Sequence, residues 1–211
     1  MEKANPKAVN VTVLWSDPDL IAVDKPAGLL SHPGADGKRD NLADWMRQTF
    51  PQAERLVMQH RLDKDTSGLL LWSQSARACA PLAQAIAERR WNKVYLAWVE
   101  GSPPKRGRID MALGEVRGRV RPDARGKLAV TEFLRVRQQG LLSLLELRPL
   151  QGRKHQLRVH LAQSGWPIVG DPLYGGRASG RLWLHAWKLS LDHPVTGQPL
   201  ELCAPVPSNW A

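Results

Sequence analysis

The chain has 211 residues, and its 30 basic against 20 acidic residues leave a net charge of +10. This length can bury a full core, and two distant cysteines, Cys79 and Cys203, exclude a disulfide scaffold and a zinc cluster. No apolar run approaches the roughly 20 residues of a membrane span, and residues 1–10 hold no signal-peptide pattern. We therefore expect a cytoplasmic protein of one domain, residues 1–211, with one lobe or two. So basic a domain favours a polyanionic partner.

The first half of the chain predicts strands and helices in alternation. Residues 11–23 form two apolar runs around a four-residue turn and predict a hairpin. After a loop at residues 34–40, apolar side chains at 42–49 repeat with helical spacing. Residues 68–72 predict a short buried strand. A helix follows at 75–90; Pro81 either kinks it or lies in the first turn of a shorter helix.

The second half is dominated by predicted strands. The predicted segments are a strand at 94–99, a Gly-, Pro- and Arg-rich hairpin and loop at 102–128, a hairpin at 130–147, a helix at 154–164 with Gly165 behind it, and strands at 182–191 and 200–203. Hairpin-linked strands with a few separate helices indicate an α+β fold with a mainly antiparallel sheet.

Residues 60–71 form the most informative segment. Here a charged cluster containing Asp63 comes directly before the buried strand. A carboxylate in a loop that a rigid strand holds, at the edge of a core, suits chemistry. Asp63 is equally compatible with a turn former, because an aspartate before Thr-Ser-Gly often bonds nearby backbone amides.

Basic residues crowd into a glycine-punctuated stretch between residues 105 and 127. These side chains either contact the phosphates of a nucleic acid or belong to a solvated loop. The chain also has nine tryptophans, of which most are expected in the core and one or two could stack on unpaired bases.

Six ordered motifs between residues 20 and 205 resemble the RluA family of RNA pseudouridine synthases. The residues from His60 to Leu71 match the family's active-site motif His-Arg-Leu-Asp, two variable residues, Thr-Ser-Gly and an apolar strand at every fixed position. The other matches are Lys25-Pro26-Ala27-Gly28, the Lys93-x-Tyr95 strand, residues 126–133, Gly152-Arg153-Lys154-His155-Gln156-Leu157-Arg158-Val159-His160, and residues 170–175.

The resemblance implies a pseudouridine synthase fold: a large, bent, mainly antiparallel mixed sheet with a central active-site cleft and a few flanking helices. It also implies isomerisation of specific uridines to pseudouridine in ribosomal or transfer RNA, without cofactor or metal. The chain is similar to the short, single-domain branch that has no S4-type RNA-binding domain, and we expect a monomer.

By the same resemblance, Asp63 is the catalytic carboxylate. It would either attack the anomeric carbon or remove the proton of the adjacent carbon. Arg158 would pair with Asp63 and keep it charged and oriented, and Tyr95 would stack on the uracil and relay a proton from its C5.

The expected RNA-binding residues fall into two groups. Arg61 would fill the space left by the flipped uridine or clamp a phosphate, while His60 is expected mainly to support the loop. The others are Arg117, Arg119, Arg121, Lys127 and Arg153.

Two other functions are compatible with parts of the sequence. A glycoside hydrolase could use Asp63 and Asp65 as its acid and nucleophile. A non-catalytic RNA- or ribosome-binding protein could retain a relic of the pocket.

Overall fold

The computed structural model describes residues 10–34 and 39–210. Two expectations therefore concern residues that lie largely outside the described ones: that residues 1–10 hold no signal peptide, and that residues 34–40 form a loop. The helices are α1 (Leu42–Thr49), α2 (Ala76–Ala87) and α3 (Gln156–Gln163), with a short 3-10 turn at Ser208–Trp210. The strands are β1 (Thr12–Ser16), β2 (Leu20–Lys25), β3 (Val57–Met58), β4 (Ser67–Ser73), β5 (Trp91–Glu100), β6 (Arg106–Val116), β7 (Arg119–Pro122), β8 (Lys127–Gln139), β9 (Leu142–Pro149), β10 (Leu184–Asp192) and β11 (Pro199–Cys203).

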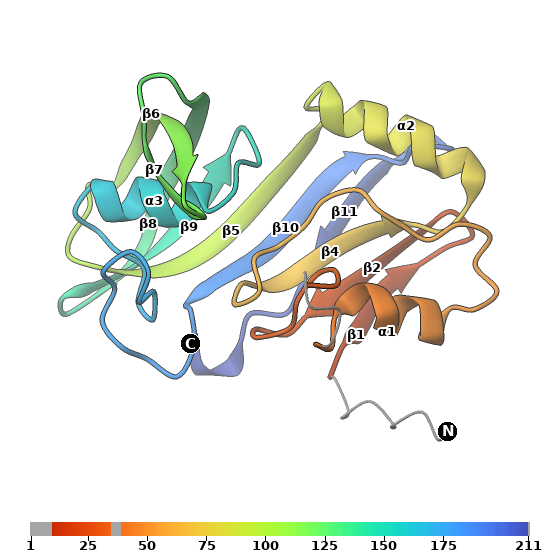
Figure 1. The fold of residues 1–211 in the computed structure, drawn as a ribbon, viewed down its shortest axis with the longest axis horizontal. Coiled ribbons are helices and arrows are strands. Elements are labelled where there is room, and N and C mark those ends of the chain that lie inside the picture. The colour runs from red at the N-terminus through yellow and green to blue at the C-terminus, as the bar shows by residue number, and fades with distance from the viewer. Residues whose placement is uncertain (1–9, 35–38, 211) are drawn as a thin grey trace.

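These strands form one sheet in the order β1-β2-β4-β10-β5-β9-β8-β6-β7, with β11 beside β10 and β3 beside β4. Every neighbouring pair is antiparallel except β4 and β10, which run parallel. The long strands β5 and β10 run through the middle of the molecule, with α3 and β6–β9 on one side and α1 and α2 on the other (Figure 1). The expected α+β class and mainly antiparallel mixed sheet are confirmed.

The strand after the Asp63 loop is buried on both faces. Alternate side chains of β4 pack in two clusters: Leu69 and Leu71 with α2, and Leu70 and Trp72 with α1. A strand covered on both sides needs apolar residues without alternation, which explains the run Gly-Leu-Leu-Leu-Trp. The loop before β4 is thus fixed to the most rigid part of the sheet.

Gly68 is required where β4 meets β10. Its φ is +109°, and a Cβ there would lie 2.2 Å from the backbone oxygen of Ala186. Only glycine allows this approach. The glycine of the Thr-Ser-Gly motif therefore brings β10 against the start of β4, beside the Asp63 loop.

The helices largely follow the predicted pattern. Asn41 caps α1, with its side chain accepting a hydrogen bond from the Asp44 N–H. The α2 helix begins at Ala76 behind a Ser75 cap, so Pro81 lies inside it and the alternative of a shorter helix is wrong. Within the described residues, no helix is long and apolar enough to span a membrane.

Candidate functional site

The Lys-Pro-x-Gly segment holds the Asp63 loop in place. Lys25 is fully buried, and its Nζ donates to the carbonyl oxygens of Pro26, Leu29 and Lys64 at 2.8–2.9 Å. The Gly28 N–H donates to the same Lys64 carbonyl. Burial lowers the pKa of Lys25 to about 7, but three carbonyl acceptors match the three N–H groups of the ammonium form. Lys25 thus connects the Lys-Pro-x-Gly motif to the Asp63 loop through hydrogen bonds.

Replacing Lys25 by Met should destabilise the protein and misplace the Asp63 loop. At least one of the three carbonyls would lose its partner inside the core, at a cost of about 1–3 kcal/mol for each unsatisfied group. Thermal unfolding should show a lower Tm, and activity should fall even at temperatures where the variant is folded. An unchanged Tm would show that the three hydrogen bonds of Lys25 add nothing to the stability of the fold.

Arg158 and Asp171 form an ion pair next to Asp63. Arg158 projects from α3 and forms a two-pronged ion pair with the fully buried Asp171, through Nε at 2.7 Å and Nη2 at 2.8 Å. Its remaining nitrogen, Nη1, lies 3.4 Å from Oδ2 of Asp63. Burial alone would lower the pKa of Arg158, but the bonds and charges of Asp171 and Asp63 raise it overall. Arg158 thus stays charged and contacts Asp63 through one nitrogen, while Asp171 is its principal partner.

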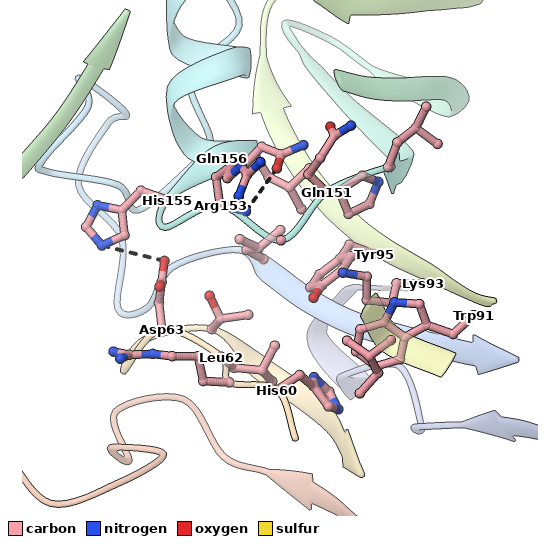
Figure 2. Close-up of a pocket in the computed structure, with 18 of the residues that line it drawn as sticks. His60, Leu62, Asp63, Trp91, Lys93, Tyr95, Gln151, Arg153, His155 and Gln156 are labelled. Atoms are coloured by element: carbon pink, nitrogen blue, oxygen red, sulfur yellow. Dashed lines mark hydrogen bonds and ion pairs between the residues drawn. The ribbon is translucent and has the colours of Figure 1, made fainter. Parts of the chain in front are cut away.

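His155 is a second neighbour of Asp63 that sequence reasoning missed. Its Nε2 lies 3.7 Å from Oδ2 of Asp63, and its Nδ1 lies 2.8 Å from the Tyr174 hydroxyl (Figure 2). His155 has a left-handed backbone, with φ of 52°, at the N-cap of α3, where the predicted helix had already begun. Burial is the largest influence on His155 and lowers its pKa, against the charge of Asp63. The sequence signal that could have identified His155 is its place in the motif of residues 152–160, at the start of the predicted helix.

Asp63 opens onto a cavity of about 500 Å³ between the sheet and the loop that precedes α3. Of the predicted site residues, the cavity brings together Asp63, Tyr95, Arg158, His60, Arg61 and Arg153. Tyr95 points into it from β5 (Figure 2). Burial, aided by the charge of Asp63, raises the pKa of Tyr95 far above its usual value, so the phenol keeps its proton.

His60 and Arg61 differ in their placement around this cavity. The Nε2 of His60 accepts a hydrogen bond from the Leu71 N–H at 3.0 Å, and its ring packs edge-on against Trp91. Burial lowers the pKa of His60 to about 3, so the ring is neutral and supports the loop. Arg61 is exposed at the mouth of the cavity.

Four predicted RNA-binding residues lie outside the cavity lining, on the β6–β7 hairpin and the start of β8. These are Arg117, Arg119, Arg121 and Lys127, all exposed. Arg119 donates to the Leu173 carbonyl and lies over the Tyr174 ring, which fixes the hairpin to the segment behind His155. The basic stretch is therefore mostly strand rather than loop.

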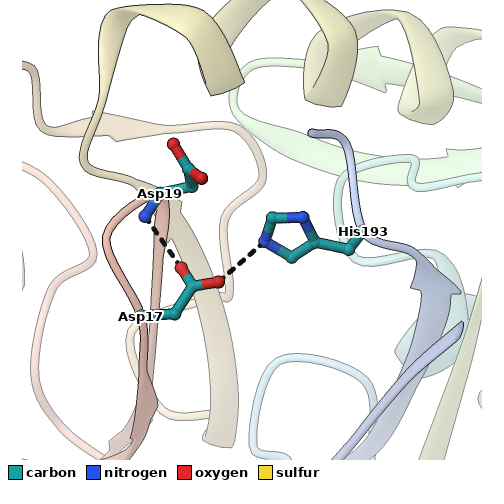
Figure 3. Close-up of side chains that lie close together, drawn as sticks. All are labelled: Asp17, Asp19 and His193. Carbon is teal, nitrogen blue, oxygen red and sulfur yellow. Dashed lines mark hydrogen bonds and ion pairs between the residues drawn. The ribbon is translucent and has the colours of Figure 1, made fainter. Parts of the chain in front are cut away.

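Asp17, Asp19 and His193 lie close together in a separate cluster (Figure 3). Asp17 Oδ1 accepts the backbone N–H groups of Asp19 and Leu20, and its Oδ2 lies 2.9 Å from Nε2 of His193. The Asp19 carboxylate binds Arg77 through both oxygens. Both carboxylates thus have partners within the protein, and the cluster connects the β1–β2 turn with the β10–β11 turn.

Comparison with known proteins gives a consistent match. Residues 19–163 match the family model described as RNA pseudouridylate synthase. The chain is 40% identical over 200 residues to an uncharacterised RNA pseudouridine synthase of Chloroflexus aurantiacus, covering 88% of this chain and 63% of that protein. It is 36% identical to ribosomal large subunit pseudouridine synthase D of Xanthomonas campestris, covering 98% of this chain and 69% of the relative.

A tRNA pseudouridine synthase C of Pectobacterium carotovorum is 34% identical over 94% of this chain and 60% of its own length. Among solved structures, human RNA pseudouridylate synthase domain containing 1 superposes with a TM-score of 0.79 at 28% identity, covering 97% of this chain and 86% of the human one. The chain thus spans roughly two thirds of the length of these curated relatives.

Proposed function

The chain belongs to the RNA pseudouridylate synthase family, and on that premise we propose that it isomerises uridine in ribosomal or transfer RNA to pseudouridine. The observation that carries the proposal is the cavity in which Asp63 faces Arg158 and His155 while Tyr95 enters from β5. Both classes of RNA are included because relatives are named for each.

The proposed reaction breaks the bond between uracil N1 and the sugar C1′ and joins C5 to the same carbon. C5 loses a proton and N1 gains one, so nothing is oxidised and no group is lost. Asp63, whose Oδ2 lies beside Nη1 of Arg158, either attacks C1′ or removes the C2′ proton. Tyr95 keeps its phenolic proton, so its first role is to stack on the base, and its hydroxyl can relay the C5 proton through exchange.

The uridine must leave its helix before it can react. Arg61, exposed at the mouth of the cavity, is placed to fill the vacated position or to bind a flanking phosphate. Arg153 lines the same cavity from the loop before α3 and is proposed to contact RNA there. One chain supplies every proposed catalytic group, which supports a monomer. Both cysteines are free, which supports a cytoplasmic location.

The two alternatives are less well supported. A glycoside hydrolase needs a pair of carboxyl groups at the sugar, but Asp65 is exposed and Asp63 is the one carboxylate among the described residues that line the cavity. A relic pocket would not be expected to keep Asp63, Tyr95 and Arg158 together in one place.

The target is best found by chemical mapping of pseudouridine in cellular RNA with and without this protein. We expect one or a few uridines to lose the modification when the protein is absent and to regain it when the protein is restored. Identical maps in both conditions would contradict the proposed function in that cell.

RNA binding should depend on salt through the β6–β7 hairpin. Replacing Arg117, Arg121 and Lys127 by Gln should flatten the plot of log K against log salt concentration, by about 0.7–0.9 for each lost phosphate contact. Arg119 is left in place because it holds Leu173. A control with Arg47 and Arg90 changed to Gln removes exposed, carboxylate-paired charges elsewhere and should change the slope less. Equal slopes in both variants would place the RNA on another surface.

A further inference from the structure

The cavity has a second end that the proposed chemistry does not use. Trp91, Lys93 and Tyr95 alternate along β5, so they share one face of the strand. Figure 2 shows Asp63 and His155 at one end of the cavity and Trp91 and Lys93 at the other, with Tyr95 between them. Groups at this far end can contact parts of the substrate that lie beyond the reacting base.

Lys93 is held in place by its surroundings. Its Nζ lies 4.7 Å from the centre of the Trp91 ring, and that ring packs nearly perpendicular to the ring of His60. On the other side is Gly152, where an added Cβ would lie 3.4 Å from Nζ. The loop before α3 therefore passes close to the ammonium group without placing a side chain there, which leaves the group open to the cavity.

This cation lacks a counterion in the described part of the chain. Lys93 makes no hydrogen bond and no ion pair among residues 10–34 and 39–210, whereas Lys154 on the neighbouring loop pairs with Glu115 at 2.5 Å. Arg89 and Arg153 line the same cavity and add further positive charge. Burial, without a compensating carboxylate, lowers the pKa of Lys93 to about 8.

An anion is the ligand that this environment lacks. A half-buried cation has lost part of its hydration. A phosphate oxygen returns a hydrogen bond and also neutralises the charge, whereas a uracil carbonyl returns the hydrogen bond alone. RNA carries its negative charge on its phosphates. A phosphate would therefore complete the site without changing the protein.

We propose that Lys93 binds a backbone phosphate of the RNA next to the reacting uridine, and so anchors the strand at the end of the cavity opposite Asp63. The inference rests on the proposed function, because the RNA substrate supplies the phosphate. Trp91 and Gly152 are positioning residues: the indole supports the side chain from one side, and the bare glycine leaves room on the other.

The test uses Lys93→Gln and Lys93→Arg, with Lys188→Gln as a matched control. Lys188 also lies over a tryptophan, 3.9 Å from the Trp187 ring, but it is exposed on β10 and does not line the cavity. The probe is a short single-stranded RNA containing uridine, and its binding is measured over a range of salt concentrations. Thermal unfolding of each variant checks that the fold is kept.

We expect Lys93→Gln to weaken binding about tenfold, the effect of losing one charged hydrogen bond. The slope of log K against log salt should fall by about 0.7, the value for one phosphate contact to a single strand. Lys188→Gln should change neither quantity, and Lys93→Arg should restore most of both. In turnover of the mapped RNA, Lys93→Gln should raise KM and leave kcat nearly unchanged.

Binding should also depend on pH through Lys93. The ammonium form binds phosphate and the neutral amine does not, so wild-type affinity should fall as the pH rises above about 8. Lys93→Arg should lack this fall, because a guanidinium keeps its charge. The pKa of His60 is lowered to about 3 and that of Tyr95 is raised far above its usual value, so neither of these two neighbours titrates near pH 8.

An unchanged slope and KM in a folded Lys93→Gln variant would overturn the proposal, as would a loss confined to kcat, which would place Lys93 on the base. These results are separable from the fate of the proposed function. Lys93-dependent binding without pseudouridine formation would leave the phosphate site standing and refute the activity. Pseudouridine formation that is unaffected by Lys93→Gln would support the activity and refute the phosphate site.

Discussion

Replacing Asp63 by Asn should abolish pseudouridine formation, with a loss on the order of 10³-fold or more, while RNA binding changes little. The amide has nearly the same shape as the carboxylate, and its oxygen can still accept from Arg158 Nη1, now 3.4 Å away. It cannot attack C1′ or take up a proton. Turnover of the mapped RNA and its equilibrium binding, measured on the same preparation, check the two halves of this expectation.

Asp65→Asn is the matched control for this prediction. It makes the same chemical change two residues along the same loop, but Asp65 is exposed and does not line the cavity. We expect it to retain most of the activity. Substantial turnover by Asp63→Asn, or equal losses in the two variants, would remove Asp63 from the chemistry.

Replacing Arg158 by Met should be costly for both activity and stability. The buried carboxylate of Asp171 would lose the two guanidinium bonds at 2.7 and 2.8 Å that compensate its charge, and breaking one side of a buried pair costs about 3–5 kcal/mol. Asp63 would lose the cation that orients it. Denaturant unfolding measures the first effect, and single-turnover rates below the unfolding transition measure the second.

The double variant Arg158→Met/Asp171→Asn separates these two effects. It removes both charges, so part of the lost stability should return, because the amide oxygen can still accept the N–H groups of Leu173 and Tyr174. Activity should stay low, since Asp63 still lacks its partner. Recovery of activity together with stability would mean that Arg158 acts only on the fold.

The parts of the site that are local in the sequence were predictable. The apolar run of β4 required a buried strand, and the charged loop before it placed Asp63 at the edge of the core. The helical spacing of the apolar side chains at 42–49 was sufficient to predict α1 at its observed bounds. These features depend on the nearest neighbours along the chain.

Features that depend on distant pairing were not predictable from residue patterns. Asp63 and Arg158 are 95 positions apart, and they meet because β4 pairs in parallel with β10, a pairing that Gly68 permits. The resemblance identified the pair but not the dominance of Asp171, which is seen only when the turn after α3 folds back. The left-handed backbone of His155 and the position of Lys93 beside Gly152 likewise appear only once the loop before α3 is placed against β5.

The most direct test of the account follows the hydrogen at C5 of the uracil ring. RNA carrying tritium at that position, incubated with the purified protein, should release tritium to water in step with pseudouridine formation and without release of free uracil. Asp63→Asn should release none. Free uracil would identify a glycosidase, and RNA that is bound by the wild-type protein but keeps all of its tritium would contradict the isomerase assignment.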